Sequence, residues 1–458
     1  MQMTRTQSDA TVLLRSARRV PARALGAALG VLVAAIYFLG AGRSFDYDGS
    51  VTVGTFVRSG NPFDVFRTVY AFNNHPYFSF VEHLLWDAGG HSEAWLRVVP
   101  IACAAATVGI LTAWTARRWG ATAGVIGGAV LAANPMFADL GRSVRGYSLM
   151  VLGCTVATIV LVDSDRRPGR MTKGRSAVYA AALGVAIGTQ FYAVIVLAAH
   201  LAALMAQRRF DSGWRRRIEA VVVIGALPYA AMLRPLFDST RNRRGAFEPG
   251  FPIDAARAVL GQQYLAVVLL GALTICALSV AAVRRPLLPA IAVIMVALLA
   301  IWIVLHPLDL YPRFLVWLVP AVAVAAAAAI AHRPLLVPIA IVAIVAMAVP
   351  QASTWTTDPI ASRHFAQMVD AARVDGQTPC AAGYSTEAIL GYTPRVRSVF
   401  TASQLVGCDS LFADVDTSAA QIRTLSCNFA QQRTLPGRTK IVVFTQPDSS
   451  RIPAACAA

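Results

Sequence analysis

Two carboxylates separated by one residue, Asp46 and Asp48, directly follow the first long apolar stretch of the chain. A carboxylate at this place can act as a general base toward an acceptor hydroxyl. The pair can also bind a divalent cation that neutralises a phosphate leaving group. A third interpretation is that the two side chains only open a solvated loop. We take Asp46 and Asp48 as the candidate catalytic residues, and as the metal ligands if a cation is needed.

The segment after the acidic pair is rich in Asn, Pro, His and aromatic residues. Residues 73–78 read Asn-Asn-His-Pro-Tyr-Phe, and Glu82 follows shortly afterwards. Residues 92–100 then read Ser-Glu-Ala-Trp-Leu-Arg-Val-Val-Pro and lead into the next apolar stretch. The whole loop, residues 43–96, is too long for a simple turn, and long loops of this kind are often functional.

The composition places these residues in a membrane protein. Of 458 residues, 56% are hydrophobic and only 14% are charged, a balance outside the usual range of water-soluble proteins. This balance excludes a soluble enzyme. The chain has 41 Lys and Arg against 24 Asp and Glu, a net charge of +17. In an apolar chain such an excess lies at membrane borders, so we expect membrane lipids and no nucleic acid as partners.

Several apolar segments are long enough to cross a bilayer core of about 30 Å, which needs roughly 20 residues per helix. They are residues 22–41, 97–115, 121–140, 145–162, 218–236, 264–283, 287–305, 314–331 and 335–350. Clusters of Arg and Lys in short loops mark the cytoplasmic side of a membrane. These clusters lie in residues 1–21, 117–118, 166–175, 208–217 and 284–285 and at Arg333.

A further apolar stretch, residues 177–206, lies between two basic loops that both belong in the cytoplasm. It must therefore cross the membrane twice or not at all. We predict a short hairpin that turns near residues 190–192, with each half about 22 Å long at 1.5 Å per residue. One long tilted helix is the alternative. With the hairpin, the N-terminus is cytoplasmic and the C-terminus is outside.

The predicted fold is a polytopic α-helical membrane protein with about eleven transmembrane helices in residues 22–350. A cytoplasmic tail, residues 1–21, precedes them. Residues 351–458 are expected to form a small extracytoplasmic α/β domain. In this region helix-like stretches, residues 361–374 and 418–431, alternate with strand-like stretches, residues 395–400 and 440–445.

Four cysteines fall in the polar last quarter of the chain: Cys380, Cys408, Cys427 and Cys456. In an oxidising compartment they can form two disulfides, with three possible connectivities. A metal site is less favoured, because none of the spacings resembles C-x-x-C.

Taken together, the motifs resemble those of the GT-C superfamily of membrane glycosyltransferases. The similarity is to the branch that contains protein O-mannosyltransferases and bacterial lipopolysaccharide-core sugar transferases. Those proteins have an acidic pair after the first helix, a His-Pro-Pro motif with aromatics, and a Ser-Glu…Leu-Arg…Pro entry to the second helix. This chain has Tyr77 in place of the second proline. Residues 134–147 resemble the family's Ser-Pro…Arg-x-Tyr turn, and residues 311–314 its Arg-Tyr-Leu segment.

The resemblance implies a GT-C-like fold and a transferase of the cytoplasmic membrane that takes a sugar from a polyprenyl-phosphate donor. The acceptor, on the outer face, would be a glycan, a lipid or a protein of the cell envelope. Asp46 would be the base, and Asp48 would orient the acceptor or hold a cation. Arg313 would bind the donor phosphate, although lipid-headgroup contact is an equal alternative for this residue. The candidate substrate-binding residues are His75, Tyr77, Glu82, Arg145, Tyr147 and Arg313.

Three other functional classes remain open at this stage. An anion transporter would also suit many spans, but transporters tend to carry repeats and ionisable residues at the midplane. A flippase for a lipid-linked sugar shares the substrate. A non-catalytic scaffold would depend only on the C-terminal region.

Overall fold

The computed structural model describes most of the helical region and the core of the C-terminal region. The described residues are 21–58, 60–68, 74–165, 171–232, 234, 249–279, 281–304, 311–355, 362–374, 376, 378–382, 389–393, 396–399, 408–413, 429–435 and 441–447. The predicted cytoplasmic tail therefore lies almost wholly outside the described residues.

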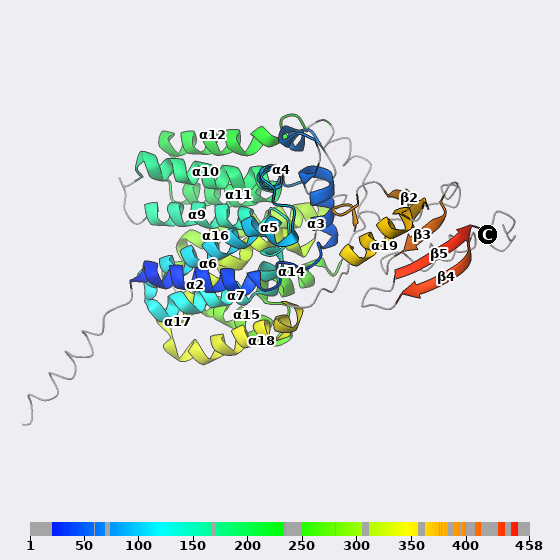
Figure 1. Ribbon diagram of the computed structural model, residues 1–458. Coiled ribbons are helices and arrows are strands. Elements are labelled where there is room, and N and C mark those ends of the chain that lie inside the picture. Colours follow the sequence, from blue (N-terminus) through cyan, green and yellow to red (C-terminus); the bar gives the residue numbers. More distant parts are fainter. Residues whose placement is uncertain are drawn as a thin grey trace, which may run out of the picture.

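Long helices lie side by side along one axis and form a bundle (Figure 1). They are α2 (Ala22–Phe38), α6 (Val98–Trp119), α7 (Ala121–Ala133), α9 (Tyr147–Asp165), α10 (Lys173–Thr189), α11 (Val194–Ala206), α12 (Ser212–Ala226), α15 (Tyr264–Ser279), α16 (Ala281–Val304), α17 (Val319–His332) and α18 (Val337–Trp355). Two short helices, α3 (Tyr47–Thr52) and α4 (Pro76–Asp87), lie at the end nearest the C-terminal sheet (Figure 1). We call this end the loop end of the bundle.

The remaining short elements connect the long helices. They are α5 (Glu93–Leu96), α8 (Pro135–Leu140), α14 (Phe251–Leu260), a π-helix (Val53–Val57) and the 3₁₀ helices Pro62–Phe66, Phe191–Ala193, Leu227–Tyr229, Pro312–Leu318 and Pro334–Leu336.

Small residues let helices α2 and α6 approach closely. A Cβ on Gly26 would lie 2.4 Å from the Gly109 carbonyl oxygen, and one on Gly30 would lie 3.0 Å from the Ala105 carbonyl oxygen. In each helix these residues are four apart, the spacing that brings helix backbones together in membranes. Side chains at these positions would push the first helix away from the bundle.

Among the described residues, fewer helices than the eleven predicted are both long enough and apolar enough to span a membrane. Among the described residues, four helices are long and apolar enough to cross a membrane: Glu93–Trp119, Tyr147–Ser164, Pro312–His332 and Pro334–Ala352. A fifth span results if α14 and α15, bent by 80°, count as one. Four shorter apolar helices also occur: Ala22–Phe38, Ala121–Ala133, Phe191–Ala206 and Pro289–Ala300. The count of eleven stays a prediction.

One predicted span, residues 121–140, is broken in the structure. Helix α7 ends at Ala133, and Asn134 then caps α8, accepting a hydrogen bond from the Phe137 amide at 3.0 Å. Pro135 removes a backbone donor, which favours a new helix start at this position. The Asn134 amide group also donates to the Val259 carbonyl oxygen at 3.0 Å, so the break joins this segment to α14.

The stretch 177–206 folds back on itself. Helices α10 and α11 are separated at Gln190, and the Tyr179 hydroxyl lies 3.1 Å from Nδ1 of His200. A continuous helix would place these residues about 30 Å apart. The predicted turn near residues 190–192 is confirmed.

The C-terminal region contains helix α19 (Ser362–Val374) and a five-stranded sheet. Its order is β2 (Arg397–Val399), β1 (Pro379–Ala382), β3 (Ser410–Ala413), β5 (Ile441–Pro447) and β4 (Phe429–Leu435). Strand β1 runs parallel to β2 and β3, whereas β5 runs antiparallel to β3 and β4. The predicted helix 361–374 and strands 395–400 and 440–445 correspond to α19, β2 and β5.

The predicted helix 418–431 is wrong where the structure describes it. Residues 429–431 belong to β4, which pairs with β5 along its whole length. Ala and Gln favour a helix locally, but pairing with a distant strand overrides that weak preference. Residues 418–428 lie outside the described residues.

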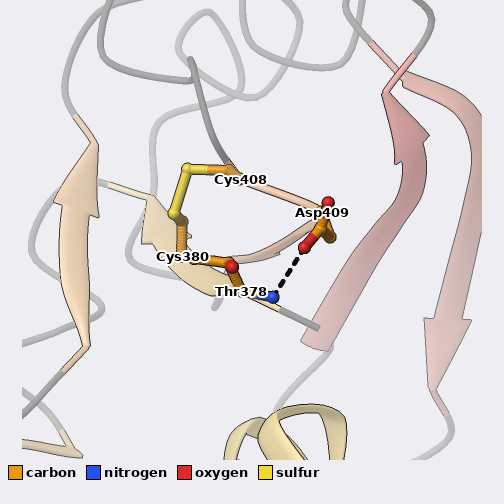
Figure 2. Close-up of a disulfide and its surroundings, with 4 residues drawn as sticks. All are labelled: Thr378, Cys380, Cys408 and Asp409. Atoms are coloured by element: carbon orange, nitrogen blue, oxygen red, sulfur yellow. Dashed lines mark hydrogen bonds between the residues drawn. A yellow bond between two sulfur atoms is a disulfide. The ribbon is translucent and has the colours of Figure 1, made fainter. Parts of the chain in front are cut away.

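One disulfide joins β1 to the start of β3 (Figure 2). It links Cys380 to Cys408, with their Cα atoms 5.8 Å apart. The Thr378 amide donates to the Asp409 carboxylate at 2.8 Å beside it (Figure 2). Cys427 and Cys456 lie outside the described residues, so a second disulfide between them stays a prediction.

The hairpin predicts opposite accessibility for two exposed phenylalanines. In a Cys276→Ser background, a cysteine replacing Phe191 should react with a membrane-impermeant maleimide in intact cells. A cysteine replacing Phe210 should react only after permeabilisation, because it lies beside a basic loop. Both phenylalanine side chains are exposed, at 48% and 43%. Labelling of position 210 from outside would reverse the predicted orientation.

The disulfide closes a loop of 28 residues. Cys380→Ser should lower the free energy of unfolding of the C-terminal region by about 3 kcal/mol, because the unfolded chain gains freedom. A denaturant titration that is monitored by the amide hydrogen exchange of β1 and β3 measures this change. Cys276→Ser is the control. Peptide mapping without reductant should recover the Cys380–Cys408 link. Free thiols at both positions in protein taken from the envelope would contradict the prediction.

Candidate active site

Asp46 is fixed at the start of α3 by two hydrogen bonds. One carboxylate oxygen accepts from the Gly49 amide at 2.6 Å, the bond that caps the helix. The other oxygen accepts from the Ser143 hydroxyl at 2.8 Å. A Cβ on Gly49 would lie 2.6 Å from the first oxygen, so this position has no room for a side chain. The carboxylate therefore has one defined orientation at the loop end.

Asp48 lies between two arginines that are distant in the sequence. Its carboxylate forms an ion pair with Arg313, and its other oxygen lies 3.9 Å from a terminal nitrogen of Arg145. The same Arg145 nitrogen donates to the Asp48 carbonyl oxygen and to the Thr52 hydroxyl, both at 3.3 Å. The Arg145 side chain is 6% exposed, whereas that of Arg313 is 33% exposed. We call Asp46, Asp48, Arg145 and Arg313 the Asp–Arg cluster.

His75 borders the Asp–Arg cluster and is buried. Its ring packs edge-on against Tyr147, with 4.8 Å between ring centroids. Burial, reinforced by the nearby charges of Arg145 and Arg313, holds the pKa of His75 well below its usual range, although a hydrogen bond with the Thr189 backbone opposes this shift. The ring is therefore neutral.

Gly146 makes this arrangement possible. A Cβ there would lie 2.4 Å from the Thr189 side chain and 3.0 Å from Nδ1 of His75. Beyond it, Tyr147 faces Phe314 at 6.5 Å, and Tyr192 stacks on Phe314 at 4.6 Å. An aromatic layer thus supports the arginines of the Asp–Arg cluster from the bundle side.

Two predicted substrate-binding residues lie apart from the Asp–Arg cluster. The Tyr77 hydroxyl donates to the Ile224 carbonyl oxygen at 2.7 Å, and its ring packs against Gly188. Glu82 is fully buried in α4, and neither of its carboxylate oxygens has a hydrogen-bond partner in the described part of the chain. Burial raises the pKa of Glu82 well above its usual range, so its carboxyl is protonated. Substrate contact by Tyr77 and Glu82 stays a prediction.

Three residues of the site were not predicted to act there. Ser143 binds the Asp46 carboxylate, and Thr52 binds Arg145. Arg97 binds the backbone of two segments, one before Asp46 and one before Arg145. Arg97 donates to the carbonyl oxygens of Ala41, Arg43, Ser44 and Arg142 at 2.6, 2.5, 2.8 and 2.9 Å. Its place in the Leu-Arg…Pro motif was the one available signal.

The side chains of the Asp–Arg cluster do not suit a bound divalent cation. Within the described ranges, no group of three or more His, Cys, Asp or Glu side chains is arranged to hold one. The oxygens of Asp48 face two guanidinium groups, whose charge opposes a second cation nearby. The donor set therefore does not fit the divalent cation considered from the sequence.

The buried His75 predicts a pH dependence of stability. In the unfolded chain its pKa is about 6.5, so below that pH the unfolded state binds a proton that the folded state rejects. The free energy of unfolding should therefore fall by up to about 2 kcal/mol between pH 7 and pH 5 because of this residue. His75→Gln should remove that loss, measured as unfolding midpoints in detergent at both pH values. The exposed His91→Gln is the control, and equal pH dependence in all three proteins would contradict the prediction.

Comparison with known proteins gives matches at the level of structure. No protein-family model matches the chain, and a search of curated proteins finds no match. The structure of ArnT from Cupriavidus metallidurans in the apo state has a TM-score of 0.62 at 12% identity, covering 96% of this chain and 98% of ArnT. The same protein bound to undecaprenyl phosphate gives 0.60 at 16% identity, covering 93% and 99%.

The arabinofuranosyltransferase AftD from Mycobacteria has a TM-score of 0.51 at 13% identity. The match covers 94% of this chain but only 40% of AftD. These similarities extend over nearly the whole chain, including both the bundle and the C-terminal region. The chain therefore has the fold of the GT-C membrane glycosyltransferases, which its sequence motifs resemble.

Proposed function

We propose that the chain is a membrane glycosyltransferase that transfers a sugar from a polyprenyl-phosphate donor. The acceptor is a glycan, lipid or protein on the outer face of the cytoplasmic membrane. The observation that carries this proposal is the Asp–Arg cluster, which brings an oriented carboxylate beside two guanidinium groups. The fold supports the choice of donor, because ArnT, which shares it, binds undecaprenyl phosphate in one structure.

The reaction needs opposite charges at its two ends. The acceptor hydroxyl gives its proton to the base while its oxygen bonds to the anomeric carbon of the sugar. The bond from that carbon to the phosphate oxygen breaks, and the polyprenyl phosphate leaves with the electron pair. A carboxylate base and fixed cations at the leaving oxygen are what this step requires.

Asp46 is suited to be the base. Each of its oxygens accepts one hydrogen bond, and a carboxylate offers about four acceptor positions. One position on each oxygen thus remains for an acceptor hydroxyl. The bonds from Gly49 and Ser143 hold the carboxylate in a single orientation, which a positioned base requires.

Arg313 is suited to bind the donor phosphate. It is the more exposed arginine of the cluster, and its guanidinium lies over the Tyr311 ring at 4.6 Å. Phosphate and carboxylate present similar oxygens to a guanidinium. We infer that the phosphate takes the place of Asp48 on Arg313, while the buried Arg145 retains Asp48. His75, neutral and buried beside the Asp–Arg cluster, would hydrogen-bond to the sugar or the phosphate.

Asp46→Asn tests the base. Asparagine is an equally good helix cap, so α3 should be kept while the proton acceptor is lost. Turnover should fall about 10²- to 10⁴-fold, with little change in donor binding. Purified protein in liposomes would be tested with radiolabelled hexose and pentose on polyprenyl phosphate. The control is Asp87→Asn, an exposed residue of the same loop.

Near-normal turnover of Asp46→Asn would move the role of base to Asp48. Donor that crosses the bilayer without losing its sugar would support a flippase instead of a transferase. If the unaltered protein showed neither activity, the interpretation as a non-catalytic scaffold would be the one that remains.

Arg313→Ala tests phosphate binding. Loss of one charge-assisted contact of about 1.5 to 3 kcal/mol should raise the donor KM by about 10- to 100-fold. The matched control is Arg257→Ala, because the Arg257 guanidinium also lies 4.8 Å from a tyrosine ring, that of Tyr264. The same KM for Arg313→Ala and for unaltered protein would remove Arg313 from the donor site.

A further inference from the structure

A short segment of the C-terminal region, residues 389–393, lies directly on the loop that carries Asp46. We call it the docking segment. The Tyr392 hydroxyl accepts a hydrogen bond from the Phe45 amide at 2.7 Å, and the two rings pack 5.1 Å apart. Phe45 immediately precedes Asp46 in the chain. The backbone on the N-terminal side of Asp46 is therefore bonded to a residue about 350 positions away.

The docking segment also holds the other side of the acidic pair. The Gly391 amide donates to the Ser50 hydroxyl at 2.9 Å. A Cβ on Gly391 would lie 3.1 Å from both Cα and the carbonyl oxygen of Ser50, so the two backbones meet closely. Arg58 donates to the carbonyl oxygens of Gly391 and Tyr392, both at 2.9 Å. Contacts with the docking segment thus flank Asp46 and Asp48 on both sides.

Glu93 links Tyr392 to a second part of the C-terminal region. Its carboxylate accepts from the Tyr392 hydroxyl at 3.0 Å and from Nε of Arg363, in α19, at 2.7 Å. Arg363 also donates to the Gly42 carbonyl oxygen at 2.6 Å. Burial and the charge of Glu93 raise the pKa of Tyr392. The hydroxyl therefore keeps its proton, which it donates to Glu93 while it accepts from Phe45.

Helix α3 needs such external support. It has six residues and runs directly into the five-residue π-helix Val53–Val57, and a helical segment this short is marginal by itself in water. Its N-terminal cap is Asp46, so any movement of α3 moves the carboxylate. A displacement of about 1 Å at a reacting group can cost about 100-fold in rate.

We infer that the docking segment positions residues 45–52, which we call the acidic loop, for catalysis and that Tyr392 is its main positioning residue. This inference rests on the proposed function of Asp46 as a base. It gives the C-terminal region a role in the transfer step although none of its described residues belongs to the Asp–Arg cluster.

Tyr392→Phe tests the inference, because it keeps the packed ring and removes only the hydroxyl. The kcat should fall about 10-fold or more as Asp46 loses its fixed place. The donor KM should stay within about 2-fold, since Arg313 lies on another element. The matched control is Asp409→Ala, which removes a hydrogen bond of 2.8 Å from the Thr378 amide within the C-terminal region but outside the docking segment. A general loss of stability would affect both variants alike, whereas positioning affects Tyr392→Phe alone.

Hydrogen exchange supplies a measurement that does not depend on activity. In Tyr392→Phe the Phe45 amide loses its acceptor, so peptides covering residues 45–52 should exchange at least about 10-fold faster. Exchange in α6 and in the sheet should not change. Arg58→Ala should resemble Tyr392→Phe, and Arg58→Lys should restore part of the kcat because it retains a donor.

Unchanged kcat and unchanged exchange in Tyr392→Phe would overturn the inference, as would equal losses in Asp409→Ala. If no protein, unaltered or variant, transferred sugar, the proposed function would fail separately. Exchange of the Phe45 amide would then still show whether the docking segment holds the loop.

Discussion

The arrangement of the site depends on one buried guanidinium. Arg97 is 3% exposed and donates to four backbone carbonyl oxygens, three before the acidic loop and one in the turn before Arg145. Hydrogen bonds to a charged group contribute about 1.5 to 3 kcal/mol each, and a buried carbonyl left unpaired costs a similar amount. The segment leading to Asp46 and the segment leading to Arg145 therefore cannot separate while Arg97 stays in place.

Two parts of the chain contact the acidic loop. The bundle supplies Ser143, Arg145 and Arg313, which bind the carboxylates themselves. The C-terminal region supplies the docking segment, which binds the backbone around them. The bundle thus supplies partners for the carboxylates, and the C-terminal region supplies contacts to the backbone around them. This division is consistent with a fold whose C-terminal region matches known structures together with the bundle.

The sequence was most informative where residue type and location agreed. Charge placement in the loops predicted the turn near Gln190. Asp48 was predicted because the acidic pair directly follows the first apolar stretch, and Arg313 because it lies at a helix start. Contacts to backbone atoms were invisible, because any residue can supply a carbonyl to Arg97. The Glu93–Tyr392 bond, between residues 299 positions apart, also left no local pattern. The break at Asn134 had a local signal in Pro135, whereas the contact that joins this break to Val259 left none.

The hairpin of α10 and α11 has a consequence for the lipid around the protein. With the 3₁₀ turn that precedes it, α11 extends from Phe191 to Ala206, and α10 has 17 residues, so the two arms are about 24 and 26 Å long. A hydrocarbon core of about 30 Å exceeds both lengths, and such mismatch is relieved by thinning the adjacent bilayer. A crossing at this hairpin would therefore compress the surrounding acyl chains on one flank of the bundle. Headgroups on that flank would lie closer to the bilayer centre than elsewhere around the bundle.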